Sequence, residues 1–241
     1  MSSRADWVEL EHGQVLELLP SGTTAEEAEA MSRRWNEIRA MGGPMPFVHG
    51  PGISNGRVGV IIDAPKGPDY RGWMAQNPYL WERMFDMLSH DFHEMHLIRM
   101  PELPSVVERM TGRINGVVDV DAQHKAKALK LLERNAGADY LMHWNYLPEN
   151  IICTLEGPFP IKWEGCGRGP WLADLARSAV LLRLENDDYY RSNMVKGYLR
   201  QCNYTEDELN PWLGTVAMDK LADNVPEERD VLRSLVRRHL G

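Results

Sequence analysis

The sequence has few cysteines, no long apolar run and no excess of positive charge. Its three cysteines form no C-x-x-C pair, so neither a disulfide framework nor a zinc knuckle is indicated. No segment approaches the ~20 apolar residues that a membrane span needs, and the opening MSSRADWVELE lacks the apolar core of a secretory signal. The net charge of −8 argues against a nucleic-acid or anionic-membrane surface as partner. A cytoplasmic protein is expected.

What is present is typical of a globular protein: 43% of the 241 residues are hydrophobic and 26% are charged. Residues 8–20 alternate around a His-Gly turn and predict a β-hairpin. Residues 21–43 predict a helix with Thr23 or Thr24 as its N-cap. Residues 44–65 predict two more strands across the turn Asn55-Gly56. The Pro- and Gly-punctuated segment 65–73 is expected to be a linker.

Beyond that segment, apolar residues recur at helical spacing through most of the chain. Helices are predicted over 78–98, 104–115, 121–136, 170–185, 187–202, 205–222 and 226–240. Residues 150–163 predict a further short hairpin. The expected fold class is α+β, with a small β-rich N-lobe over residues 1–68 and a larger, mainly helical C-lobe over 69–241.

Two stretches of the C-lobe carry polar residues at informative spacing: LMHWNYLPENII (141–152) and PIKWEGCGRGPWLADLA (160–176). They resemble the aminoglycoside phosphotransferase and choline kinase-like family, a small-molecule branch of the protein-kinase fold. The family's catalytic loop, His-Gly-Asp-x-x-x-x-Asn, is matched by His143, Trp144, Asn145 and Asn150. Its metal-binding strand, Ile-Asp-Trp with a later glycine and aspartate, is matched at Ile161, Lys162, Trp163, Gly169 and Asp174. The resemblance implies a kinase-like bilobal fold.

The same resemblance implies that the chain has lost groups that phosphoryl transfer requires. Kinase-type phosphoryl transfer needs a phosphate-covering loop, a strand lysine, an aspartate as base and carboxylate or amide ligands for Mg²⁺. Here Asn145 stands at the base position, Lys162 at the metal position and Glu17 at the strand-lysine position. The first strand and the glycine-rich loop are expected to be missing, because few residues precede the hairpin. The resemblance therefore indicates a degenerate, N-terminally truncated member without ATP or Mg²⁺ as cofactors.

Bulky aromatic residues accompany these changes. Trp144 replaces a family glycine, Tyr146 follows it, Trp163 keeps a family aromatic, and Trp171 stands where proline is usual. They either fill the space left by nucleotide and metal or form the walls of a pocket for a small organic ligand. In the second case Glu164, Arg168 and Asn145 would be its polar anchors. The resemblance also implies that His143 and Asp174 keep a structural role around the loop.

No metal site is predicted. His93 and His96 lie three residues apart, but their spacing is not His-Glu-x-x-His and no fourth ligand is evident. Structural histidines are expected instead.

Three functions stay open. The leading one is a pseudokinase that acts by binding a small molecule or a protein partner. The second is nucleotide-independent catalysis with Lys162, Glu17 or Glu164 as acid or base. The third is an unconventional but active small-molecule kinase. Glu17 and Lys162 invert both charges of a pair that faces across a kinase phosphate site. A Glu17–Lys162 salt bridge, direct or bridged by a water, is therefore expected.

Overall fold

The computed structural model describes residues 6–241, and the chain divides into two compact units. The first unit combines Met1–Trp81 with Leu147–Gly165, and the second combines Glu82–Tyr146 with Cys166–Gly241. Both stretches that carry the kinase-like motifs are therefore split between the units. The expected lobe division at residue 68 remains a prediction.

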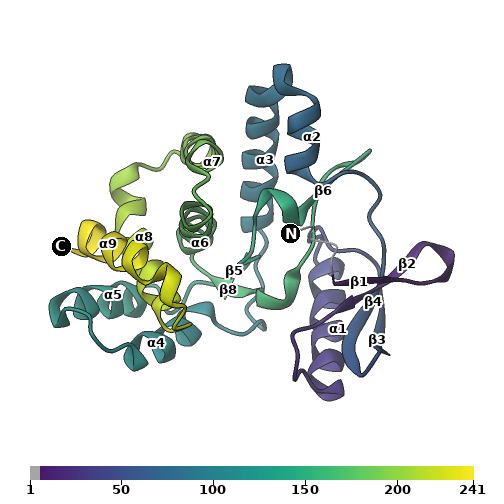
Figure 1. Ribbon diagram of the computed structural model, residues 1–241, viewed down its shortest axis with the longest axis horizontal. Helices are drawn as coiled ribbons and strands as arrows, with labels where there is room; N and C mark the ends of the chain where they lie inside the picture. The colour runs from purple at the N-terminus through teal and green to yellow at the C-terminus, as the bar shows by residue number, and fades with distance from the viewer. Residues whose placement is uncertain (1–5) are drawn as a thin grey trace. The chain divides into compact units, whose positions relative to one another are not determined.

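A four-stranded antiparallel sheet forms the main part of the first unit (Figure 1). Its strands are β1 (Trp7–Glu9), β2 (Gln14–Leu18), β3 (Val48–Ser54) and β4 (Arg57–Asp63), in the order β1-β2-β4-β3. Both predicted hairpins are present. Asn55 and Gly56 have φ values of 48° and 76°, the left-handed conformation that a tight Asn-Gly hairpin turn requires. The sheet places β2, which carries Glu17, between two hydrogen-bonded neighbours.

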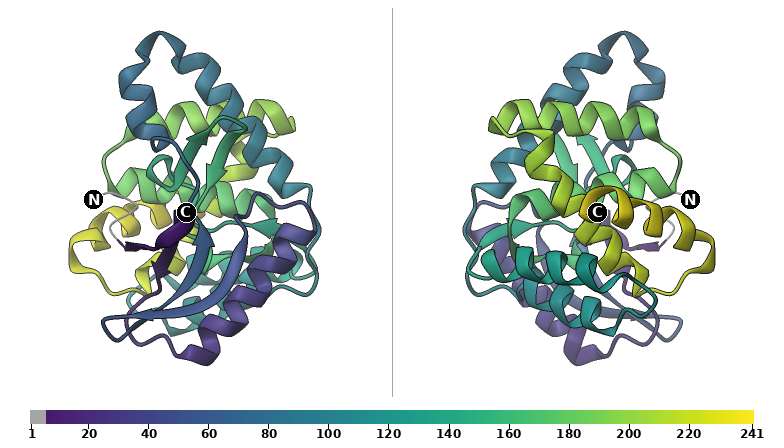
Figure 2. Two further views of the ribbon diagram at one scale, coloured as in Figure 1. Left: turned by 90° about the vertical axis from the view of Figure 1, so that its right-hand side faces the viewer. Right: turned by 90° about the vertical axis from the view of Figure 1, so that its left-hand side faces the viewer.

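Helix α1 (Ala25–Ala40) covers one face of this sheet and contacts β3 and β4 (Figures 1 and 2). It begins at a capping box: the Thr24 side chain accepts from the Glu27 backbone, and the Glu27 side chain accepts from the Thr24 backbone. Its inner face buries Ala28, Trp35 and Ile38. The predicted helix is confirmed, with ends a few residues inside the expected range.

The segment predicted as a linker is more ordered than expected, which is a correction. Asp69 accepts a hydrogen bond from the backbone of Gly72 at 2.7 Å and thereby caps helix α2 (Tyr70–Gln76). Just before it, Gly67 has φ 150°, and a Cβ atom there would lie 1.9 Å from the carbonyl oxygen of Cys153. Glycine thus lets this segment lie against β6 (Ile151–Thr154), which pairs with β7 (Gly157–Pro160) as the predicted hairpin.

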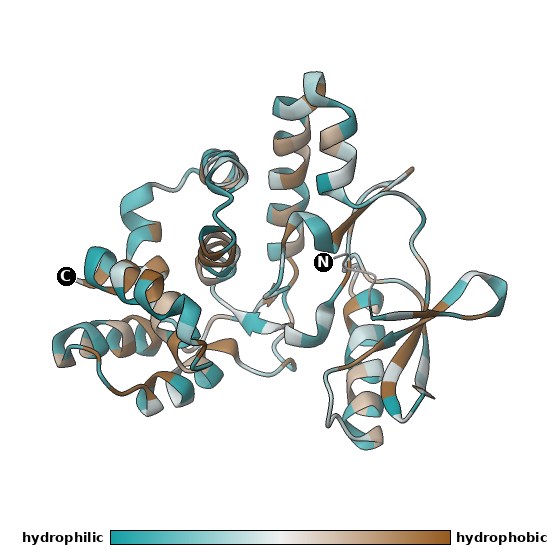
Figure 3. Cartoon of the chain, in the orientation of Figure 1, coloured by the Kyte–Doolittle hydropathy of each residue, from teal (hydrophilic) through white to brown (hydrophobic). Residues whose placement is uncertain are grey.

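The second unit is mainly helical. Its helices are α3 (Trp81–His96, whose first residue belongs to the first unit), α4 (Val106–Gly116), α5 (Ala122–Arg134), α6 (Trp171–Leu184), α7 (Asp188–Cys202), α8 (Glu206–Leu221) and α9 (Arg229–Leu240). Each corresponds to a predicted helix. Helix α6 is the most completely buried of them, and its ribbon is largely brown in Figure 3. The unit also contains a two-stranded sheet of β5 (Tyr140–Met142) and β8 (Gly167–Gly169), which the sequence did not indicate.

The fold is α+β, as predicted, with a small antiparallel sheet and a larger helical part. Within residues 6–241, no helix is long and apolar enough to cross a membrane.

Candidate functional site

In the first unit, Lys162 lies among acidic side chains. Its Nζ atom is 3.7 Å from Glu17 Oε1 and 3.4 Å from Asp6 Oδ2. Asp6 in turn forms an ion pair with Arg57 at 3.3 Å. The expected Glu17–Lys162 contact is present, but Lys162 is shared with a closer partner, Asp6, that sequence reasoning missed. We call Asp6, Glu17, Lys162 and Glu164 the charge cluster.

Glu17 is the most deeply buried member of the charge cluster. It pairs with Val60 of β4 in the centre of the sheet and is only 3% exposed. Burial, followed by the nearby Glu164 carboxylate, raises the pKa of Glu17 to about 8, although Lys162 opposes the shift. Near pH 7 the Glu17 carboxyl therefore holds its proton, and Lys162 draws most of its ionic attraction from Asp6. The contact becomes a full ion pair only at alkaline pH.

Glu164 closes the charge cluster from the segment after β7. Burial raises the pKa of this carboxyl as well, and its Oε2 atom has no hydrogen-bond partner among residues 6–241. Two carboxyls with raised pKa values thus belong to the same cluster as Lys162. Such perturbed groups are typical of functional sites, although structural ion pairs show them too.

The backbone at Lys162 is in the left-handed region, with φ 67°. A lysine adopts this conformation at a cost of about 1–3 kcal/mol, which the surrounding structure must outweigh. Hydrogen bonds fix the residues on either side of it: Ile161 N donates to Asn150 O at 2.8 Å, and the Trp163 indole donates to Pro160 O at 3.0 Å. Asn150 and Trp163, both expected ligand-binding residues, thus lie in the buried framework that presents Lys162.

In the second unit, Asp174 of α6 organises the loop that resembles a catalytic loop. Its two carboxylate oxygens accept hydrogen bonds from the backbone N–H groups of His143 (2.7 Å) and Trp144 (2.8 Å). One of them also contacts His96 Nε2 at 3.1 Å. All of these groups are buried, so the carboxylate exchanges water for three donors. These contacts hold the loop against α6, and the structural role of Asp174 remains a prediction.

His96 continues this network. Its Nδ1 atom lies 2.5 Å from the Tyr198 hydroxyl, so α3, α6 and α7 are joined through one buried chain of polar contacts. His93 instead lies 3.1 Å from the Cys202 thiol and stacks on Trp171. These contacts agree with the structural interpretation of both histidines. Among residues 6–241, no group of three His, Cys, Asp or Glu side chains could hold a metal ion.

Within the loop, the side chains of Trp144 and Tyr146 are part of the core. Tyr146 is 1% exposed and stacks on Phe92 with a centroid distance of 4.0 Å. Asn145 donates its backbone N–H to His143 Nδ1 at 3.2 Å. Trp144 has φ 68°, a conformation suited to the glycine that the family carries at this position. This packing favours the interpretation that bulky residues have filled space.

Two arginines flank the Trp144 indole. The guanidinium groups of Arg109 and Arg177 each lie 5.5 Å from its ring centroid, within cation–π range. The Nε and Nη1 atoms of Arg177 are buried without a hydrogen-bond partner in the described chain, and burial lowers the pKa of this guanidinium. No pattern in the sequence indicated these two residues. The Trp144 indole therefore lies between two cationic groups.

Arg168 and Trp171, the remaining residues predicted to bind a ligand, both contact neighbouring protein groups. The Arg168 guanidinium donates to the carbonyl oxygens of Leu103 (3.1 Å) and Ala138 (3.4 Å). Trp171 is stacked on Tyr140 with a centroid distance of 5.4 Å. The structure thus brings together Glu17, Lys162 and Glu164 in one unit. In the other unit it brings together His143, Trp144, Asn145, Tyr146 and Asp174.

Known proteins resemble this chain in structure alone. It matches no protein-family model and no curated protein sequence. A thermostable mutant of aminoglycoside phosphotransferase APH(4)-Ia, in a ternary complex with AMP-PNP and hygromycin B, superposes with a TM-score of 0.65 at 10% identity. That alignment covers 97% of this chain and 90% of the other.

Two further structures agree. Aminoglycoside phosphotransferase APH(3'')-Id from Streptomyces rimosus, in complex with ADP and streptomycin, gives a TM-score of 0.61 at 15% identity over 89% of this chain and 92% of its own. Amicoumacin kinase hAmiN, in complex with AMP-PNP, Ca²⁺ and Ami, gives a TM-score of 0.57 at 13% identity over 94% of this chain and 81% of its own. The chain has the kinase-like fold of the aminoglycoside phosphotransferases.

Proposed function

We propose that this protein is a degenerate small-molecule-kinase-like protein that acts by binding a ligand or a protein partner, without conventional ATP-dependent phosphotransfer. The observation that carries the proposal is the contact of Lys162 with Asp6 and Glu17. A cation held at the metal-ligand position repels Mg²⁺ by several kcal/mol at close range in a partly buried site. A carboxyl at the strand-lysine position supplies no charge to neutralise a triphosphate.

The loop in the second unit supports the same conclusion. Asn145 is an amide and has no basic function at neutral pH, so it cannot accept the proton of an acceptor hydroxyl. The surrounding scaffold nevertheless keeps its polar contacts through Asp174 and His96. A loop that is held in place but lacks the charged groups of phosphotransfer fits a protein that binds a ligand or partner without transferring phosphate.

Titration calorimetry with ATP–Mg²⁺ tests this proposal, alongside an active aminoglycoside phosphotransferase as positive control. We expect no binding tighter than about 1 mM, which corresponds to about −4 kcal/mol. Melting temperatures should accordingly stay constant up to about 0.1 mM nucleotide, since a ligand far below its dissociation constant adds almost no stability to the folded state. A micromolar dissociation constant, or phosphorylation of any alcohol or amine, would overturn the proposal in favour of an unconventional kinase.

The pKa of Glu17 supports a second candidate, nucleotide-independent proton-transfer chemistry. A carboxyl with pKa about 8 beside a lysine has the proton affinity of a general acid or base that works near neutral pH. NMR of metabolite mixtures incubated with the protein would detect turnover. This candidate requires that Glu17→Gln abolishes the turnover and that Glu9→Gln, which changes an exposed glutamate on β1, does not.

A further inference from the structure

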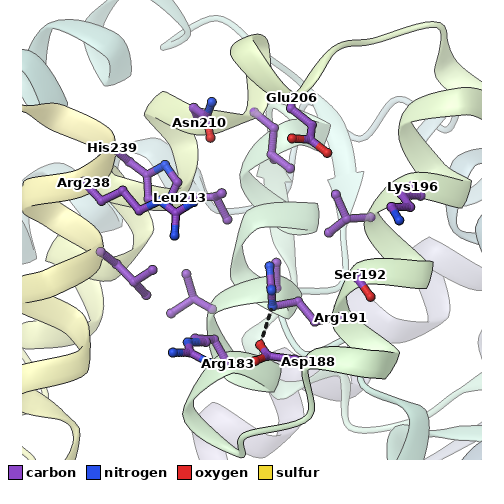
Figure 4. Close-up of a pocket in the computed structure, with 15 residues that line it drawn as sticks. Arg183, Asp188, Arg191, Ser192, Lys196, Glu206, Asn210, Leu213, Arg238 and His239 are labelled. Carbon is purple, nitrogen blue, oxygen red and sulfur yellow. Dashed lines mark hydrogen bonds and ion pairs between the residues drawn. The ribbon is translucent and has the colours of Figure 1, made fainter.

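A cavity of about 420 Å³ lies within the second unit among helices α6, α7, α8 and α9 (Figure 4). Its volume falls in the range of pockets that accept small organic molecules. None of its lining residues belongs to the charge cluster or to the loop around Trp144. It is therefore a separate candidate binding site.

The deepest lining residues are apolar. Ala179 and Val180 of α6 and Leu209 of α8 are each 1–2% exposed, and Val195 of α7 is 9% exposed. Asn210 and Ser192 supply neutral hydrogen-bonding groups nearer the rim (Figure 4). Such a surface accepts the apolar body of a ligand and leaves its polar group at the edge.

The rim carries an excess of positive charge. Four cationic side chains line the cavity, Arg183, Arg191, Lys196 and Arg238, against two carboxylates, Asp188 and Glu206. The protein as a whole has a net charge of −8, so this local excess is opposite in sign to the rest of the surface. A positively lined concavity raises the local concentration of anions.

The existing ion pairs leave part of this charge uncompensated. Asp188 is shared by Arg183 at 2.8 Å and Arg191 at 3.1 Å. Lys196 and Arg238 form no ion pair with residues 6–241. Burial, and then the positive charges of Arg238 and Arg191, lower the pKa of His239. Cationic groups from α7 and α9 thus act on the same part of the cavity.

We propose that this cavity binds a small organic anion, with a phosphate or carboxylate group held by Arg191 and Arg238 and an apolar body seated on Val180, Val195 and Leu209. Arginine and lysine both recognise these anions through charge-assisted hydrogen bonds. The site requires no nucleotide and no metal. It stands independently of whether the kinase-like positions retain any activity.

Titration calorimetry with phenyl phosphate tests the proposal, because this probe combines the anionic group with an apolar ring. We expect a dissociation constant of about 1 mM or below. Inorganic phosphate, which lacks the ring, should bind at least about tenfold more weakly, and neutral benzyl alcohol should not bind measurably. Benzoate in place of phenyl phosphate shows which of the two anionic groups is preferred, and either preference supports the site.

Matched variants locate the binding. Arg238→Gln should weaken phenyl phosphate binding about tenfold, the loss of one charge-assisted contact, whereas Lys196→Gln, across the cavity from Arg238, should weaken it less (Figure 4). Arg237→Gln is the control, because Arg237 is the preceding arginine of α9 and does not line the cavity. Equal weakening by Arg237→Gln and Arg238→Gln would show nonspecific attraction and overturn the proposal. So would the absence of binding to the folded wild-type protein at 10 mM probe.

Discussion

At the scale of single residues, Glu17 is the most informative position of the chain. Its pKa of about 8, against 4.5 for an ordinary glutamate, means that the folded state binds this proton more tightly than the unfolded state. As pH rises from about 4.5 to about 8, unfolding becomes easier, because only the unfolded chain releases the proton freely. The contribution of Glu17 to stability is therefore lost across that window and constant above it.

The variant Glu17→Gln removes this titration while keeping the size of the side chain. We expect it to match the wild type near pH 4 and to exceed its free energy of unfolding by about 2–4 kcal/mol at pH 8.5. Urea unfolding between pH 4 and pH 9 measures the difference. Glu9→Gln, on the exposed side of the neighbouring strand, should shift stability little at any pH. Parallel pH profiles for wild type and Glu17→Gln would contradict the assigned pKa.

The sequence indicated part of this site at residue level, and the reason is specific. Glu17 and Lys162 could be paired from sequence because each stands at a motif position whose usual charge is opposite. Asp6, the closer partner of Lys162, belongs to no motif and lies 156 residues away along the chain. Arg109 and Arg177 were missed for the same reason. Their approach to Trp144 depends on tertiary packing, which no local pattern encodes.

At the scale of elements, the sequence was sufficient to predict a helix where a capping motif marks its first residues. The capping box of Thr24 and Glu27 marks the start of α1, and Thr205 with Glu208 marks that of α8 in the same way. The short α2 was missed because Pro and Gly obscure its cap, Asp69. Strand β8 was missed because Gly-Arg-Gly has low strand propensity and pairs only through distant β5.

Asp174 connects three parts of the second unit. It lies on α6, accepts hydrogen bonds from the backbone of His143 and Trp144 in the loop, and contacts His96 of α3. We expect Asp174→Asn to lower the free energy of unfolding by about 2–4 kcal/mol. An amide offers one acceptor oxygen, so its NH₂ group would face a backbone N–H donor and leave it unsatisfied. Urea unfolding measures the loss. Asp207→Asn, in the exposed first turn of α8, is the control and should cost well under half as much. An unchanged midpoint for Asp174→Asn would refute the structural role.

At the scale of the whole molecule, the first unit is built from two segments separated by more than sixty residues of the second unit. Its amino-terminal part carries Asp6 and Glu17, and its later part carries Lys162 and Glu164. The sequence prediction places the later part in the C-lobe, and that lobe division stays a prediction, because motif spacing does not reveal which compact unit a segment packs into. The charge cluster therefore joins stretches of chain that are brought together only by folding of this unit.

Exchanging the charges of Glu17 and Lys162 tests whether the stability of the first unit depends on the contact between them. Glu17→Lys places two ammonium groups together, and Lys162→Asp places a fourth carboxyl in the charge cluster. At pH 9, where Glu17 is ionised, each single change should destabilise the protein by about 3–5 kcal/mol, because a buried charge then loses its counterpart. The double variant should recover most of the loss, which a double-mutant cycle reports as an interaction energy.

The pH dependence of this cycle distinguishes a specific pair from general electrostatics. Wild-type Glu17 is protonated at pH 6 and ionised at pH 9, because its pKa is about 8. The Glu17–Lys162 attraction that the cycle removes is therefore larger at pH 9, so the interaction energy should grow by about 1–2 kcal/mol between the two conditions. Additive single changes at pH 9 would show that Lys162 is held by Asp6 alone. In that case the inverted charges at the two kinase-like positions would be neighbours without coupling.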